Sequence, residues 1–169
     1  MAAVLSQIVG VFVIVAVVVA PHLKNKRDLL LVLLLANALT VVQFALLGAA
    51  TEVAVITVST FRTLVFYLYS RREMRAPLWV FVGICVLQGG AVALTWKSAL
   101  SLLMLFDMVQ TYGQWQTNMK VLRVCTIIAA IPIGIYNFAV KGYMGAINQA
   151  GQAVSASYAL WNLHYRKRE

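Results

Sequence analysis

The sequence predicts an all-α membrane protein with seven transmembrane helices, and three observations lead to this fold class. First, 62% of the 169 residues are hydrophobic and only 11% are charged, whereas a soluble domain carries roughly a quarter charged residues. Second, the apolar residues fall into seven blocks. Third, the Lys and Arg residues gather at alternate ends of those blocks, as they do in the cytoplasmic loops of membrane proteins.

Each apolar block is a candidate membrane span, since a helix needs about 20 apolar residues to cross the hydrocarbon core. The first block ends at Pro21 without a charged leading region or a small-residue cleavage site, so we expect a retained helix rather than a signal peptide. Pro77 opens the fourth block, and Pro132 interrupts the sixth, where it is a candidate hinge. In chain order the blocks cover residues 5–20, 29–47, 53–69, 78–96, 100–112, 121–140 and 143–163.

The basic residues orient these spans. With the first loop placed inside, eleven of the fourteen Lys and Arg residues lie on the cytoplasmic side, and two, Lys97 and Lys141, lie outside. The N-terminus is then outside and the C-terminus cytoplasmic, which requires an odd number of spans. The cytoplasmic set comprises Lys24, Lys26, Arg27, Arg71, Arg72, Arg75, Lys120, Arg123, Arg166, Lys167 and Arg168.

The fifth block is the most ambiguous span, because it is short and carries Asp107 and Gln110. The charge pattern decides in its favour. Without it, Lys120 and Arg123 would lie outside and every later segment would be inverted. We therefore predict seven helices rather than six.

The two halves of the chain resemble each other at an offset of 94 residues. This offset pairs Lys26 with Lys120 and Gly48 with Gly142. It also pairs Arg72, in the basic segment after the third block, with Arg166, in the basic segment after the seventh. We therefore predict two parallel three-helix repeats, residues 1–75 and 99–169, because a single linking span at 76–98 restores the orientation of the second repeat.

Arg62 and Asp107 are the leading candidates for function, because a charge inside a span costs several kcal/mol unless it is paired or hydrated. At 1.5 Å per residue they lie roughly 15 Å and 12 Å from the outer end of their spans. Because these spans belong to different repeats, an Arg62–Asp107 pair would cross the cavity between them and act as a gate or a proton-sensitive coupling pair. The alternatives are a static ion pair and an Arg62 side chain that extends toward the inner interface.

Amides form a second candidate set. Six amides lie inside predicted spans, namely Asn37, Gln43, Asn137, Asn148, Gln149 and Gln152. Of these, Asn37, Asn137, Asn148 and Gln152 would hydrogen-bond a solute; the alternative is that the amides join helices to one another. Tyr136 precedes Asn137, and together they form a candidate pair for recognising a hydroxyl group or a ring.

Other polar residues carry weaker signals. Gln88, beside Gly89, is expected to mark a flexible or close-packing point of the linking span. Cys85 and Cys125 are expected to be inert thiols inside apolar blocks. No metal-ligand spacing, phosphate loop or paired carboxylate is present in the sequence, so we expect neither an enzyme nor a cofactor.

The net charge of +9 does not indicate nucleic-acid binding, because the basic residues form short clusters between apolar blocks. Anionic lipids of the inner leaflet are the expected counter-charge, at roughly 1 kcal/mol per basic residue near the surface. Both repeats lie in one chain, so a monomer could enclose the cavity, and nothing in the sequence excludes a homo-oligomer.

Several short motifs carry a family resemblance over nearly the whole chain. The motifs are Pro21-His22-Leu23-Lys24-Asn25, Leu46-Leu47-Gly48, Arg62-Thr63-Leu64, and Tyr136-Asn137-Phe138 with Gly142, Gly145 and Asn148. With these residues the sequence resembles the YgjV family of bacterial inner-membrane proteins, and at a distance it is similar to the PQ-loop and SWEET transporters and to PnuC vitamin carriers. The first motif resembles a PQ-loop signature with His in place of Gln. The resemblance implies a three-one-three, SWEET-like fold with an axial cavity and, by analogy, transport.

The leading functional prediction is a facilitator or proton-coupled carrier of a small polar solute in the bacterial inner membrane, in which one three-helix unit rocks against the other. The alternative is a non-transporting membrane scaffold, assembly partner or sensor, and an intramembrane enzyme comes third. A central cavity that reaches Arg62 would favour transport, whereas a closely packed centre would favour a scaffold.

Overall fold

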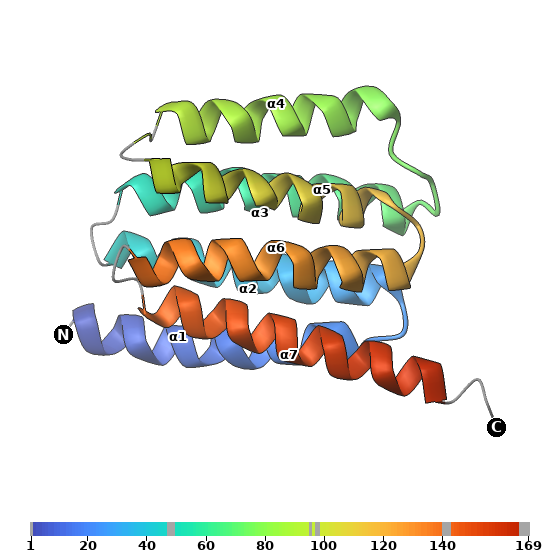
Figure 1. Ribbon diagram of the computed structural model, residues 1–169, viewed down its shortest axis with the longest axis horizontal. Helices are drawn as coiled ribbons and strands as arrows, with labels where there is room; N and C mark the ends of the chain where they lie inside the picture. The colour runs from blue at the N-terminus through green and yellow to red at the C-terminus, as the bar shows by residue number, and fades with distance from the viewer. Residues whose placement is uncertain (1, 47–49, 95, 97–98, 140–142, 166–169) are drawn as a thin grey trace.

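The computed structural model describes residues 2–46, 50–94, 96, 99–139 and 143–165, and in these residues every regular element is helical (Figure 1). Seven α-helices and two 3₁₀ helices are present in this part of the chain, so the predicted all-α class is confirmed. The elements are α1 (Ala2–Val19), η1 (Ala20–His22), α2 (Lys26–Leu46), α3 (Ala50–Arg71), α4 (Leu78–Leu94), η2 (Ala99–Phe106), α5 (Asp107–Trp115), α6 (Met119–Ala139) and α7 (Tyr143–Tyr165).

The seven helices match the seven predicted spans in order, with one difference in kind. The ambiguous fifth block consists of the 3₁₀ helix η2, which leads directly into α5. Among the described helices, α6 meets the length and composition expected of a membrane crossing, and the apolar stretches Ile8–His22 and Leu78–Leu94 are shorter. The crossing of the other helices and their orientation stay predictions that rest on the charge pattern.

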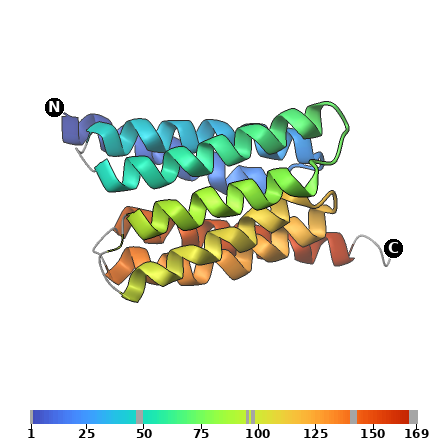
Figure 2. The ribbon, with the colours of Figure 1, turned by 90° about the horizontal axis from the view of Figure 1, so that it is seen from above.

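The helices form two layers. Helices α1, α2 and α3 lie side by side in one layer, and η2–α5, α6 and α7 lie in the other (Figures 1 and 2). Helix α1 contacts α7, and α3 contacts α5, across the space between the layers. Helix α4 packs along one side of the bundle, against α3 and against η2–α5.

The two ends of the bundle differ in composition. We call the end that holds the connections α1–α2, α3–α4 and α5–α6 the basic end, because Lys24, Arg27, Arg72, Arg75 and Lys120 lie there. The opposite end, where α1, α3, η2 and α7 begin, is the far end. The two chain termini lie at opposite ends of the bundle (Figure 1). The predicted loop charges Lys97, Lys141, Arg166, Lys167 and Arg168 lie outside the described residues.

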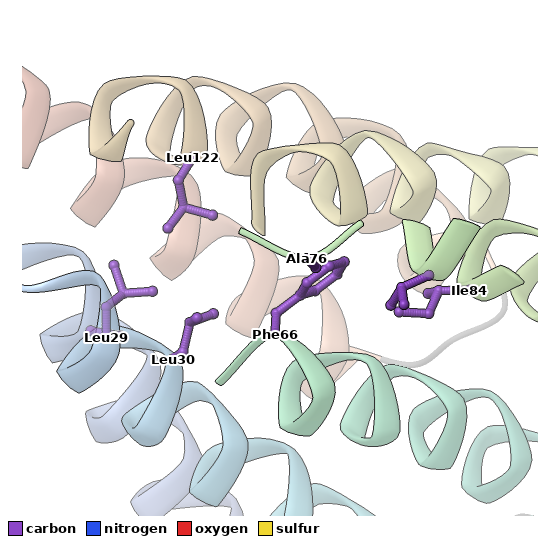
Figure 3. Packing of buried hydrophobic residues seen from close by; sticks show 8 residues of the cluster. Leu29, Leu30, Phe66, Ala76, Ile84 and Leu122 are labelled. Atoms are coloured by element: carbon purple, nitrogen blue, oxygen red, sulfur yellow. The ribbon is translucent and has the colours of Figure 1, made fainter. Parts of the chain in front are cut away.

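An apolar cluster fills the space between the layers near the basic end (Figure 3). The Phe66 side chain of α3 is 2% exposed and lies beside Ala76 and Ile84, while Leu30 of α2 and Leu122 of α6 lie on the other side of it. The basic-end cluster, as we call it, comprises Ala20, Leu29, Leu30, Phe66, Ala76, Val80, Ile84 and Leu122.

The outer surface of the bundle is apolar. Leu94 is 90% exposed, Val154 70% and Phe138 67%, and many other large hydrophobic side chains also point outward. A soluble monomer rarely exposes contiguous apolar surface of this extent. The exposed surface therefore suits lipid as its solvent, as the composition predicts.

Two prolines act at helix boundaries, and the third lies within a helix. Pro77 immediately precedes α4, and Pro21 lies in the short helix η1, positions where a missing N–H is tolerated. Pro132 lies inside α6, which continues helical on both sides of it. The hinge role expected for Pro132 stays a prediction.

Candidate functional site

A cavity of about 280 Å³ lies between the two layers. Its walls include residues from all seven described α-helices, from Gly10 of α1 to Gln152 of α7. The cavity occupies the half of the bundle nearer the far end. Its lining residues nearest the basic end are Leu33, Gln114 and Gln152, and the basic-end cluster begins beyond them. Ligand pockets generally measure about 300–1,000 Å³, so the space suits a small solute.

A buried ion pair forms part of the cavity wall. Arg62 Nη1 lies 2.7 Å from Asp107 Oδ2, and the two side chains are 3% and 15% exposed. Arg62 belongs to α3 in one layer, and Asp107 is the first residue of α5 in the other. The contact expected from the similar depth of the two residues is therefore present, and it joins the two layers.

Neutral side chains complete the environment of this ion pair. Asp107 Oδ2 also accepts hydrogen bonds from Ser59 Oγ at 3.1 Å and from Gln88 Nε2 at 2.8 Å. Thr111 Oγ1 accepts from Arg62 Nη1 at 3.1 Å and lies 2.7 Å from Gln88 Oε1, to which it can donate. Each charge is therefore held by several partners rather than by the other charge alone.

The expectation for Gln88 leaves out its polar contacts. The sequence suggested a flexible or close-packing point, and the neighbouring Gly89 is closely packed, since a Cβ there would lie 3.3 Å from Met108 Cε. Gln88 itself is 5% exposed and binds both Asp107 and Thr111. The depth of Gln88 could have revealed this role. Gln88 lies about ten residues, or roughly 15 Å, from the basic end of α4, and Arg62 lies roughly as far from the opposite end of its own span. Both are therefore near the middle of the bundle. A lone amide at the depth of a buried charge is a candidate partner for that charge.

The 3₁₀ geometry of η2 explains how Asp107 reaches the cavity. In a 3₁₀ helix, side chains three residues apart eclipse one another. Ser101, Met104 and Asp107 follow this spacing, and all three line the cavity. Gln110 continues the same line into the start of α5.

The structure brings the predicted amides and Tyr136 to the same cavity. Asn37, Asn137, Asn148 and Gln152 all line it. Asn37 Nδ2 donates to Thr63 Oγ1 at 3.3 Å, a link between helices that matches the alternative role of joining them. Gln43 and Gln149 of the wider amide set line it as well. Five further polar residues of the wall were not predicted, namely Thr40, Ser59, Ser101, Gln110 and Gln114.

Asn148 differs from the other amides in one respect. Its Oδ1 atom is buried and has no hydrogen-bond partner in the described part of the chain. A buried acceptor without a partner costs roughly 1–3 kcal/mol. Asn148 thus holds an unused acceptor, and the residue itself belongs to the cavity wall.

The cavity is separated from the basic end by polar contacts as well as by the apolar cluster. Lys26 Nζ donates to the backbone oxygen of Gln116 at 2.7 Å, and Trp115 Nε1 donates to the backbone oxygen of Ala76 at 2.7 Å. The Arg75 guanidinium lies 4.0 Å from the centre of the Trp115 ring. These basic-end contacts join the connection α5–α6 to α2 and to the connection α3–α4.

Arg123 lies at the predicted end of the bundle, but its side chain is buried. The charge pattern counted it among the cytoplasmic charges at the ends of the blocks. In the structure it lies within α6, is 5% exposed and donates from Nε to the Pro21 backbone oxygen at 3.0 Å. The sequence therefore holds a second buried arginine besides Arg62. The position of Arg123 inside the apolar block 121–140 was the sequence feature that could have predicted its burial.

A family model named Imp-YgjV, described as a bacterial inner membrane protein, matches residues 4–167. The chain belongs to the Imp-YgjV family. The family resemblance and the inner-membrane location predicted from the sequence are thereby confirmed. No solved structure and no curated protein shows significant similarity to this Imp-YgjV member, so its likeness to PQ-loop and SWEET transporters stays a prediction.

Proposed function

We propose that this Imp-YgjV family member is a facilitator or proton-coupled carrier that moves a small polar solute across the bacterial inner membrane. The observation that carries the proposal is the cavity of about 280 Å³ between the layers, with the Arg62–Asp107 pair in its wall. A scaffold would have no need of such a cavity, because burying polar groups around empty space costs free energy.

The charges around the cavity favour a solute without net charge. Of the described lining residues, Arg62 and Asp107 are the ones that carry charge at neutral pH, and they neutralise each other. A charged solute would have to break this pair to gain a counter-charge. The amides offer both donors and acceptors, which suits hydroxyl, amide or ring-nitrogen groups on an uncharged molecule.

Alternating access requires the layers to move relative to each other. The basic-end cluster and the basic-end contacts separate the cavity from one side of the membrane, so both must open for solute to leave there. In carriers built from repeats, one unit rocks against the other around a central site. The Arg62–Asp107 pair links the two layers and would be made or broken in that motion, and a proton taken up by Asp107 would weaken it.

A ligand screen with purified protein tests this function. Melting temperatures would be measured against sugars, nucleosides and vitamins, with charged partners of each neutral compound, such as glucose with glucuronate and uridine with its monophosphate. We expect a neutral compound to raise the melting temperature, and its uptake into proteoliposomes to be saturable. Failure of every compound in both assays would favour the scaffold alternative.

A further inference from the structure

A second, much smaller cavity lies next to the main one on the side of the basic end. Its volume is about 20 Å³, and it shares Leu33, Gln110 and Gln152 with the main cavity. A cavity needs about 10–15 Å³ to hold one water molecule. The space therefore suits one particle of about that size.

Arg123 forms part of the wall of this small cavity. Its Nε and Nη2 atoms donate to the backbone oxygens of Pro21 and Leu23, at 3.0 Å and 3.2 Å. The third nitrogen, Nη1, is buried and has no hydrogen-bond partner among the described residues. Two nitrogens of the guanidinium group thus bind the connection α1–α2, while the third, Nη1, has no acceptor among the described residues.

The charge of Arg123 also lacks a counter-charge. The ion pair found in the described part of the chain joins Arg62 to Asp107, and no carboxylate there is in ion-pair contact with Arg123. Arg123 lies in the first turns of α6, where the helix dipole adds positive potential. A buried charge without a partner is strongly disfavoured, so this position calls for a negative ligand.

We propose that the small cavity binds a single monatomic anion, chloride under cellular conditions, beside the guanidinium group of Arg123. The amide groups of Gln110 and Gln152, which also line the space, would supply further donors. Thr126 is a weaker donor there, because its hydroxyl donates to the Leu122 backbone oxygen at 2.9 Å. A water molecule would fit the same volume, but it would leave the guanidinium charge unbalanced.

The proposed anion would stabilise the closed arrangement of the basic end. The donors Gln110, Arg123 and Gln152 come from α5, α6 and α7 of one layer. Arg123 also donates to Pro21 and Leu23 in the connection α1–α2, so an ion that holds its guanidinium group in place would support this link between the layers. This proposal does not depend on transport, since an anion could hold a scaffold together in the same way. Its test therefore uses stability and direct detection rather than uptake.

The first experiment compares melting temperatures of the detergent-purified full chain in chloride, bromide and gluconate salts at constant ionic strength. Gluconate is too large for the cavity. At a halide concentration tenfold above its Kd, we expect chloride and bromide to raise the melting temperature by about 3–6 °C over gluconate. Arg123→Gln should remove this difference. Lys120→Gln, which removes an exposed charge from the same helix, should keep it.

The second experiment needs no variant and decides the question if Arg123→Gln fails to fold. Crystals of the unmodified chain grown in bromide should show one anomalous scattering peak beside the Arg123 guanidinium. Equal melting temperatures in chloride and gluconate together with no bromide peak would identify the occupant as water and overturn the proposal. A halide effect of equal size in Arg123→Gln would also overturn it.

Discussion

The two halves of the bundle use the same helices but differ in what lies between the layers. In the far half, amides, hydroxyls and the Arg62–Asp107 pair surround an open space. In the basic half, Leu30, Phe66 and their neighbours fill that space. The change occurs within single helices: on α3, Arg62 lines the cavity while Phe66, one turn later, is packed in the cluster. One continuous helix thus lines the cavity in the far half and packs into the apolar cluster in the basic half.

This contrast suggests that side chains of the far half are selected for binding and those of the basic half for packing. Truncation should then have different consequences in the two halves. In the far half it should alter uptake or affinity, and in the basic half it should alter stability. Variants in each half, with matched controls, distinguish these outcomes.

Removal of both charges from the layer-spanning pair should have the largest effect on transport. Arg62→Gln combined with Asp107→Asn keeps the hydrogen-bonding shapes but removes the ion pair. We expect uptake into proteoliposomes to be abolished while the chain still folds. Arg62→Gln alone should be worse folded, since an unpaired partner of a buried pair costs about 3–5 kcal/mol.

The matched control for this variant is Arg72→Gln with Glu73→Gln, which removes two exposed charges from the basic end. Its uptake should equal that of the unmodified chain. If the Arg62–Asp107 double variant also transports normally, the pair is a static link between the layers and not a gate.

Truncation of the central side chain of the basic-end cluster should be the most destabilising change in that half. Phe66→Ala removes a ring that is 2% exposed, and substitutions of this kind cost about 3–5 kcal/mol. Unfolding of the purified protein by denaturant would measure the loss. A loss below about 1 kcal/mol would show that the basic half is not closely packed.

Addition of one methyl group should test the same packing from the opposite direction. A Cβ atom at Gly113 of α5 would lie 2.7 Å from Cys125 Cβ and 3.3 Å from Leu122 Cα. Gly113→Ala should therefore lower stability by about 1–3 kcal/mol. Gly83→Ala is its control, because nothing lies within 4 Å of a Cβ placed there, and the two variants should differ clearly in melting temperature.

Asn148→Ala should have the smallest effect on stability, because Asn148 Oδ1 has no partner to lose in the described structure. We expect the free energy of unfolding to change by less than about 1 kcal/mol. The affinity for the solute found in the screen should fall by about five- to tenfold, the equivalent of one hydrogen bond. Calorimetric titration would measure it, and an unchanged affinity would remove Asn148 from the solute site.

The sequence predicted the depth of residues better than their direction. Counting residues along each span placed Arg62 and Asp107 at similar depth, and the two side chains meet. The same counting does not say which way a side chain points around its helix. Ser59 and Thr111 were missed for this reason, because hydroxyl residues on the correct face look no different in sequence from those facing lipid.

Arg123 was missed for another reason. Basic residues close to a span end usually extend toward the interface, so the charge rule counted it as cytoplasmic. The acceptors that bury it are backbone oxygens of Pro21 and Leu23, about a hundred positions earlier in the chain. Backbone acceptors carry no sequence signature, so only the packing of the two layers reveals them.

The 3₁₀ segment η2 has a consequence for the lipid around the protein. A 3₁₀ helix rises about 2.0 Å per residue and an α-helix about 1.5 Å, so the 8 residues of η2 and the 9 of α5 extend about 30 Å together. That length equals the hydrocarbon thickness of a typical bilayer, about 30 Å. As an α-helix throughout, the segment would be about 4 Å shorter, and the bilayer would have to thin around it. In the membrane crossing that the charge pattern predicts for this segment, overwinding of eight residues would thus match it to the bilayer without lengthening the chain.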